Sequence, residues 1–151
     1  MLKTLCALLV ALFAQVAVAA DDRALPQDAE DLVRTAASLL KKLGPEKAYA
    51  EFSRKGGPFM FKDLYVAVYD LNGKCHMHGA KPEKAGLVLS AQPEGDQKII
   101  RARLEAIKGK DEAWQEYVYR NPANNKEEPK VAFTIKVGEL LVSAGAYKPV
   151  K

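Results

Sequence analysis

Cysteine is scarce in this 151-residue chain, and its scarcity limits the chemistry available. The two cysteines are Cys6 and Cys75, and Cys6 lies in an N-terminal apolar segment that we expect to be removed. A mature chain that keeps Cys75 alone has no internal disulfide and lacks the paired thiols of a dithiol redox enzyme. Its stability then depends on an apolar core, and the roughly 130 remaining residues are enough for one.

Long apolar runs are missing after the first 20 residues, because charged side chains interrupt every later stretch. Residues 1–20 carry Lys3, an apolar core over residues 5–13 and small residues at the end, which is typical of a secretory signal peptide. That core is shorter than the roughly 20 residues that span a bilayer. We predict cleavage after Ala19 or Ala20, no membrane span afterwards, and a periplasmic or secreted protein; an uncleaved anchor is the alternative.

A strong charge of one sign is also missing. Without Lys3, 22 of the 23 basic side chains remain against 19 acidic ones, a net charge of +3. The chain has no basic run with interleaved aromatic residues, which is the pattern that suits binding to a phosphate backbone. We therefore predict no nucleic-acid partner. The chain also has no G-x-S-x-G elbow, no P-loop and no dinucleotide fingerprint. We therefore predict a protein that is not an enzyme and that needs no cofactor.

Three segments have helical periodicity. Over residues 27–43 apolar side chains recur at helical spacing, with acidic residues in the first turns and two lysines in the last. Gly44 ends this helix, and Pro45 can open a second, shorter helix that runs through Phe52. Residues 96–107 keep the spacing of a third helix.

Strand-like patterns occupy the rest of the chain. Residues 64–69 are rich in β-branched and aromatic side chains, and the turn DLNG makes residues 74–78 the return strand of a hairpin. Three further strands are predicted at 114–120, 131–137 and 140–147. The pattern predicts an α+β fold in which a five-stranded antiparallel sheet carries the long N-terminal helix on one face and a short helix and loops over the other. Residues 21–63 would be the helical segment of the same domain, and residues 64–148 its sheet.

The hairpin strand contains the cluster KCHMHG, which holds both histidines of the chain. Regular alternation along a strand places His76 and His78 on one face and Cys75 and Met77 on the other, so the four do not converge on one ion. Two histidines are fewer than the three protein ligands of a typical catalytic zinc site. A metal site at His76 and His78, completed by a remote carboxylate, remains one alternative, and Cys75 is expected to be a small buried residue.

Three segments together resemble the single Cache domain family. The run DLYVAVYDLNGKCHMHGAKPEKAG is similar to the opening hairpin of that family, and YVYRNPANNKEEPKVAF to its Y-x-W…nP…K-x-x-Y segment. The end, LLVSAGAYK, is similar to its closing strand. The resemblance implies a PAS-like extracytoplasmic sensor domain that binds a small molecule, often a carboxylate or an amine. Tyr119 stands where the family commonly has tryptophan, and Phe133 where it commonly has tyrosine, so ligand identity does not transfer.

The resemblance also implies a set of ligand contacts. Tyr117 and Tyr119 share one strand face and can enclose a small organic molecule, while Lys130 stands at the position of the family lysine and can hold a carboxylate. His78 either hydrogen-bonds the ligand or holds the loop that follows it. Ordinary core packing or solvent exposure is the alternative for each residue. The predicted ligand-binding residues are His78, Tyr117, Tyr119, Lys130, Phe133 and Tyr147.

These observations predict an exported domain that recognises a small organic ligand without making or breaking a bond. Since no signalling region is evident after the domain, a separate partner such as a membrane sensor kinase or a chemoreceptor would read the bound state. The alternatives are a metal-binding protein that uses His76 and His78, an enzyme acting on the same ligand, and a structural accessory protein of the cell envelope.

Overall fold

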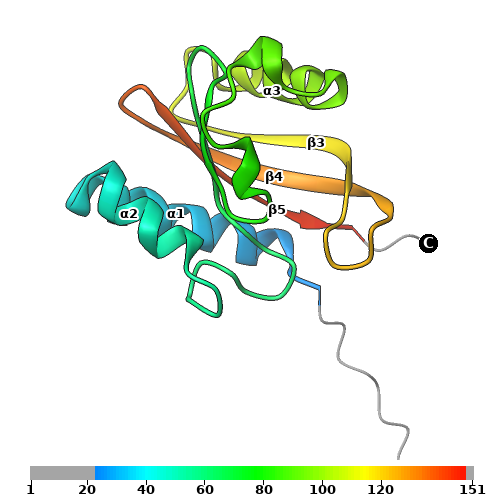
Figure 1. Cartoon of the computed structure of the whole chain (residues 1–151), viewed down its shortest axis with the longest axis horizontal. Coiled ribbons are helices and arrows are strands. Elements are labelled where there is room, and N and C mark those ends of the chain that lie inside the picture. Colours follow the sequence, from blue (N-terminus) through cyan, green and yellow to red (C-terminus); the bar gives the residue numbers. More distant parts are fainter. Residues whose placement is uncertain (1–22, 149–151) are drawn as a thin grey trace, which may run out of the picture.

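A five-stranded antiparallel sheet forms the centre of the computed structural model, which describes residues 23–148 (Figure 1). The order across the sheet is β2-β1-β5-β4-β3, so the short N-terminal hairpin pairs with the last strand of the chain. This confirms the predicted fold class, whereas the predicted signal peptide lies outside the described residues. The strands are β1 (Ala67–Asp70), β2 (Cys75–His78), β3 (Glu112–Arg120), β4 (Glu127–Val137) and β5 (Leu140–Tyr147).

Helix α1 (Pro26–Leu43) covers one face of the sheet, where it packs on β4 and β5. Its apolar stripe is buried because residues three and four apart lie on one side of a helix. Helix α2 (Pro45–Ser53) packs beside α1 and adds Phe52 to the same core (Figure 1). The largest apolar cluster of the molecule therefore lies between α1, α2 and this face, and it includes Val33, Leu40, Phe52, Val66, Val68, Phe133 and Val142.

The opposite face of the sheet is covered by helix α3 (Glu94–Ile107) and by the loop that precedes it. That loop contains two short 3-10 turns, η1 (Pro82–Lys84) and η2 (Leu89–Ala91). Helix α3 packs on β3, and its Ile100 joins Ala67, Tyr69 and Cys75 in a second, smaller apolar cluster. Helix α3 covers this second face, whereas α2 lies beside α1 on the first, and the candidate site lies beneath α3.

A β-bulge in the hairpin changes which side chains of β2 face the core. Met77 pairs with Val68 and Cys75 pairs with Tyr69, so that His76 is the extra residue. Because an extra residue shifts the alternation, Cys75 lies on the α3 side with Tyr69, whereas Met77 packs into the cluster beneath α1. The prediction that Cys75 and Met77 share a face is therefore wrong.

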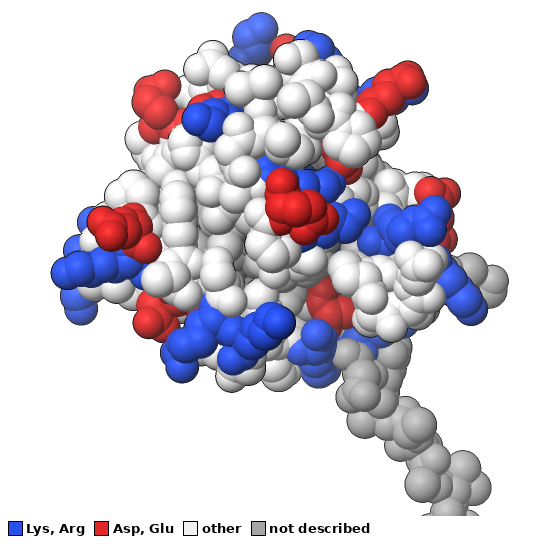
Figure 2. Space-filling view, in the orientation of Figure 1, with Lys and Arg blue, Asp and Glu red and all other residues white. Residues whose placement is uncertain are grey.

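Charge of both signs is spread over the face of the molecule that Figure 2 views. Figure 2 shows basic and acidic side chains interspersed on the face that it views, without a continuous basic area. Among residues 23–148 no helix combines the length and apolarity that are needed to cross a membrane.

Candidate ligand-binding site

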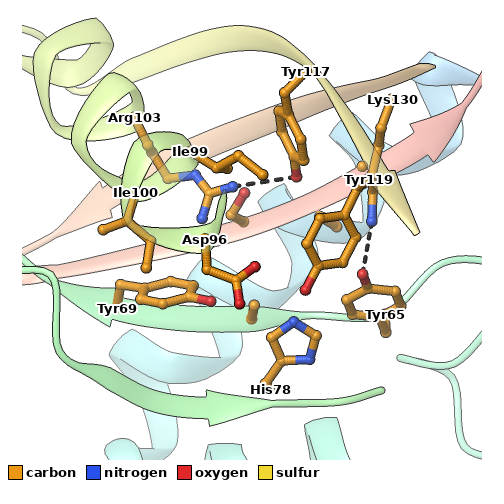
Figure 3. Close-up of a pocket in the computed structure, with 14 residues that line it drawn as sticks. Tyr65, Tyr69, His78, Asp96, Ile99, Ile100, Arg103, Tyr117, Tyr119 and Lys130 are labelled. Atoms are coloured by element: carbon orange, nitrogen blue, oxygen red, sulfur yellow. Dashed lines mark hydrogen bonds between the residues drawn. The ribbon is translucent and has the colours of Figure 1, made fainter. Parts of the chain in front are cut away.

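A cavity of about 30 Å³ lies between α3 and the sheet (Figure 3). A space of this size holds one or two water molecules, and its walls are unusually rich in phenol groups and cations. The lining residues come from all five strands, from α3 and from the segment just before β1, so segments far apart in the sequence meet here. The lining residues are Tyr65, Ala67, Tyr69, His78, Asp96, Ile99, Ile100, Arg103, Tyr117, Tyr119, Lys130, Ser143, Ala144 and Gly145.

Lys130 is the most deeply buried cation of the site, with 3 % of its surface exposed. Its Nζ donates to the Tyr65 hydroxyl at 2.9 Å and to the Tyr147 hydroxyl at 3.5 Å. The same atom lies 4.2 Å and 4.5 Å from the ring centres of Tyr65 and Tyr147, distances at which a cation is attracted to an aromatic face. These neighbours are neutral, so burial, reinforced by the charge of Arg103, lowers the pKa of Lys130 to about 7.

Arg103 approaches the cavity from α3 and is 5 % exposed. Its Nη2 donates to the Tyr117 hydroxyl at 3.3 Å, which Figure 3 marks as a dashed line. Its Nε is buried and has no hydrogen-bond partner among the described residues. Since buried donors are almost always paired in folded proteins, this N–H is an open donor on a residue that lines the cavity.

Asp96, in the first turn of α3, is the one carboxylate among the described residues that lines the cavity. Figure 3 places its carboxylate between Tyr69, Tyr119 and His78. It pairs with Lys84, a lysine of η1 that is 6 % exposed. Lys84 Nζ also donates to the Tyr119 hydroxyl at 2.9 Å, so the three residues tie the loop, α3 and β3 together. The negative charge of Asp96 is therefore already matched by a partner.

His78 closes the cavity on the β2 side and is 5 % exposed. Its Nδ1 accepts a hydrogen bond from the backbone N–H of Lys81 at 3.1 Å, and its ring lies 4.9 Å from that of Tyr65. Burial, together with the charges of Lys84 and Lys130, lowers the pKa of His78 well below its ordinary value. The ring is neutral near pH 7, and because Nδ1 accepts, the proton is on Nε2.

The comparisons with known proteins show the family and the fold. Residues 2–147 match the model of the family described as Single Cache domain 2, which is nearly the whole chain. The chain belongs to the single Cache domain 2 family. Among curated protein sequences none is a significant match. Among the solved structures that match, three that share the fold of this Cache domain have sequence identities below 20 %.

The first of these structures is a methyl-accepting chemotaxis protein from Vibrio parahaemolyticus, with a TM-score of 0.65 and 19 % identity over 80 % of this chain and 86 % of that one. The second is a Cache chemosensory domain described as recognising carboxylic acids, with a TM-score of 0.65 and 17 % identity over 82 % of this chain and 92 % of that one. The third is a periplasmic sensor domain of a chemotaxis protein, with a TM-score of 0.53 and 19 % identity over 82 % and 90 %.

The structure of the Cache domain brings four of the six predicted ligand contacts to one cavity: His78, Tyr117, Tyr119 and Lys130. Tyr147 lies behind Lys130, directly opposite it in the β4–β5 register, and its hydroxyl donates to the carbonyl of Arg120 at 3.2 Å. It supports Lys130 without lining the cavity.

Phe133 lies elsewhere. It packs in the cluster beneath α1, with its ring centre 4.8 Å from that of Trp114 and 5.0 Å from the Arg34 guanidinium. The physical reason is alternation along β4, because Phe133 is three residues after Lys130 and so points to the opposite face. The expectation that Phe133 forms a wall of the pocket is corrected on this ground.

The two histidines of the hairpin are also separated. His76 is turned outward by the bulge and its Nε2 lies 3.0 Å from an oxygen of Asp70, whereas His78 faces the cavity. Within residues 23–148 no group of three or more histidine, cysteine, aspartate or glutamate side chains could hold a metal ion.

Several residues of the site were not among the predicted contacts, namely Tyr65, Tyr69, Lys84, Asp96 and Arg103. The signal for Arg103 was present, because it is a cation inside the buried stripe of a helix, between Ile100 and Ile107. A charge at such a position is expensive unless it has a task or a partner. Lys84 carries no comparable signal, since it lies in a loop without periodicity.

Proposed function

We propose that this Cache domain senses a small carboxylate that binds between Lys130 and Arg103. The observation that supports the proposal best is the charge balance of the cavity. Lys130 and Arg103 are both buried and both hydrogen-bond to neutral phenols, while the one carboxylate of the lining is paired with Lys84. An anion is the ligand that such a site stabilises, because it supplies the missing negative charge.

The open donor of Arg103 adds a geometric argument. A carboxylate has two oxygens and can accept from a guanidinium and an ammonium at once. Arg103 Nε has no hydrogen-bond partner within the described residues. Lys130 Nζ has phenolic partners, which can remain beside it when it also contacts a ligand. One oxygen of a ligand carboxylate would accept from Arg103 Nε. The negative charge of the ligand would then lie close to both Arg103 and Lys130.

The alternative ligand class, an amine, has less support. An ammonium ligand is commonly held by aromatic faces, and here the faces of Tyr65 and Tyr147 are already turned toward Lys130. A second cation at the same place would be repelled by Lys130 and Arg103. One of the structurally similar Cache domains is described as recognising carboxylic acids, which agrees with the same choice.

The size of the cavity bears on the size of the ligand. A space of about 30 Å³ is smaller than even a short organic acid, so binding requires some lining side chains to move. Asp96 is the natural candidate, because a ligand carboxylate carries the same charge and can take over its contacts with Lys84 and Tyr119. We expect short acids of a few carbon atoms to be preferred over long ones, and a separate signalling partner in a membrane to read the displacement.

Thermal-shift measurements can test the proposal with matched pairs of compounds, such as acetate against acetamide and propionate against propionamide. A ligand that binds only the folded state raises the melting temperature as its site fills. We expect the acids to raise the melting temperature and the amides to leave it unchanged. Lys130→Met and Arg103→Met should lose the shift, whereas Lys98→Met, an exposed lysine of α3, should keep it. Equal shifts for acids and amides, or an unchanged shift in both cavity variants, would overturn the proposal.

A further inference from the structure

β3 is the terminal strand of the sheet beyond β4, and one of its edges is unpaired within the described residues (Figure 1). Hydrogen bonds that flank the β3–β4 ladder show which residues face that edge. The N–H of Lys136 donates to the carbonyl of Asp111, and the N–H of Asn121 donates to the carbonyl of Lys126. Because hydrogen-bonded pairs alternate in an antiparallel ladder, the odd-numbered residues of β3 bond to β4. The even-numbered residues therefore direct their N–H and C=O groups to the open edge.

The side chains of the same even-numbered residues are exposed, in contrast to the half-buried odd-numbered ones. Two of them are apolar, with Trp114 42 % and Val118 58 % exposed, and three are charged: Glu112, Glu116 and Arg120. The exposed face of β3 thus reads Glu, Trp, Glu, Val, Arg. Natural edge strands often carry charges that discourage pairing with other chains. On β3 the order of these charges instead allows the strand to pair with a second copy of itself.

The order is self-complementary under a two-fold axis at Glu116. When a second β3 is placed antiparallel about this residue, Glu112 lies opposite Arg120 of the second copy and Trp114 lies opposite Val118 of the second copy. Each contact occurs twice, so the arrangement has two ion pairs and two apolar pairs. These ion pairs add to the contacts that Glu112 makes with Arg34 at 2.9 Å and that Arg120 makes with Glu127 at 3.9 Å in its own chain. The two Glu116 side chains meet at the axis, and each is held by Lys148 of its own chain at 2.6 Å, which offsets their repulsion.

This register also satisfies the backbone. It pairs even-numbered residues with even-numbered residues, and these are the ones whose N–H and C=O groups are free to bond across the edge. Moving the axis to Trp114 would set Glu112 against Glu116 of the second copy, which are like charges. Moving it to Val118 would set Trp114 against Pro122 of the second copy, which has no N–H to donate.

We propose that two copies of this chain associate through β3, in the register centred on Glu116, and join their sheets into one continuous antiparallel sheet. The opposite face of β3 carries Tyr117 and Tyr119 of the cavity, so the strand that contacts the ligand is also the strand that forms the interface. Such an arrangement makes ligand occupancy and self-association energetically linked, and the linkage acts equally in both directions. The association itself does not depend on the identity of the ligand.

Sedimentation velocity over a range of protein concentrations tests the association directly. We expect a concentration-dependent dimer for the purified protein, and a dimer Kd raised about tenfold or more by Arg120→Glu, since both ion pairs become like-charge contacts. Glu112→Arg should have the same effect. Mixing the two variants should restore the dimer, because Glu meets Arg at both ends of the mixed strand pair. Lys98→Glu, which makes the same change in net charge on α3, should leave the Kd unchanged.

Two further variants test the strand pairing and its register. Val118→Pro removes an N–H that points away from β4, so we expect the monomer to keep its melting temperature within a few degrees and to lose the dimer. Glu116→Cys should form an intermolecular disulfide on mild oxidation, because facing residues of a hydrogen-bonded pair lie about 5.5 Å apart at Cα. Val118→Cys lies away from the axis and should not cross-link, and the native Cys75 is buried. A protein that stays monomeric at the highest concentration, or a dimer that Arg120→Glu and Val118→Pro leave intact, would refute the proposal.

Discussion

Lys130 and Tyr65 are in direct contact within the cavity: the lysine Nζ lies 2.9 Å from the phenolic oxygen and 4.2 Å from the centre of the same ring. The ammonium therefore has neutral neighbours on the side that faces β1, and no carboxylate within the described residues hydrogen-bonds to it. A cation in this position is poorly stabilised in the absence of an anion. Its pKa of about 7 expresses that condition and leads to the first two predictions.

The first prediction concerns stability against pH. Between about pH 7 and pH 10.5 the unfolded chain keeps the proton on Lys130 while the folded chain has lost it, so this residue makes the folded state more stable as the pH rises. Below pH 7 both states carry the proton and the contribution is flat. We expect the free energy of unfolding to rise by roughly 2 kcal/mol between pH 7 and pH 9 on account of Lys130. Urea unfolding at several pH values measures this.

Lys130→Met is the comparison for that measurement, because methionine keeps much of the length and volume of the side chain without its charge. The variant should lose the rise in stability, and the exposed Lys98→Met should retain it. Parallel curves for the wild type and Lys130→Met between pH 7 and pH 9 would show that Lys130 is charged and well stabilised in the folded state.

The second prediction concerns the protons that accompany binding. A carboxylate ligand favours the ammonium form of Lys130, so above pH 7 binding must be accompanied by uptake of a proton. We expect nearly one proton to be taken up near pH 8 and much less near pH 6, with affinity falling by up to about tenfold per pH unit above 7. Calorimetric titration in two buffers of different ionisation enthalpy gives the number of protons. No uptake near pH 8 would contradict the assignment of Lys130 as a ligand contact.

How much of this molecule follows from its sequence can be judged from particular residues. Helix α1 was predicted to within one residue at its N-terminus, because its apolar stripe, acidic start and basic end all indicate the same element. The start of β4 was missed by four residues, since Pro129 argues against a strand. The last residue pair of the β4–β5 ladder is Lys130 with Tyr147, so Pro129 lies just outside that ladder. Proline is tolerated at this position because the N–H that it lacks is not needed for pairing with β5.

The candidate site shows a different limit. Alternation along β3 correctly places Tyr117 and Tyr119 on one face of their strand. It does not tell whether Lys130 of β4 lies on the same face of the sheet, because that depends on how the two strands pair. The bulge at His76 could not be foreseen either, because it depends on the pairing with β1 and not on the residues of β2 alone. Arg103 and Lys84 enter the site through the packing of α3 and its preceding loop, which no local pattern specifies.

The third prediction concerns the ion pair between Lys84 and Asp96. Both side chains are largely buried, so removing one partner leaves an uncompensated charge in the other. We expect Asp96→Asn to lower the free energy of unfolding by about 3 kcal/mol, and Lys84→Met combined with Asp96→Leu to restore most of the loss. Urea unfolding of Lys84→Met, Asp96→Leu and the double variant gives the coupling energy. A loss well below 1 kcal/mol in Asp96→Asn would show that the pair is solvated and does not hold the loop to α3.

The fourth prediction concerns Gly145, which pairs with Ala132 in the β4–β5 ladder and lies diagonally across it from Lys130. A Cβ atom at Gly145 would lie 2.7 Å from Lys130 Cε and 2.9 Å from the backbone oxygen of Val131, and the second atom cannot move aside without disturbing the ladder. Gly145→Ala should therefore destabilise the fold by about 1–3 kcal/mol and push the lysine out of its place between the phenols.

Gly95→Ala is the matched control, because a Cβ there would meet nothing within 4 Å and the residue lies in α3, where alanine is favoured over glycine. We expect this control to bind carboxylates as the wild type does and to be slightly more stable. In Gly145→Ala the carboxylate affinity should fall together with the stability, and Lys130 should regain an ordinary lysine pKa as its Nζ reaches solvent. If Gly145→Ala kept both the affinity and the low pKa of Lys130, the close approach of β5 would not be what positions this cation.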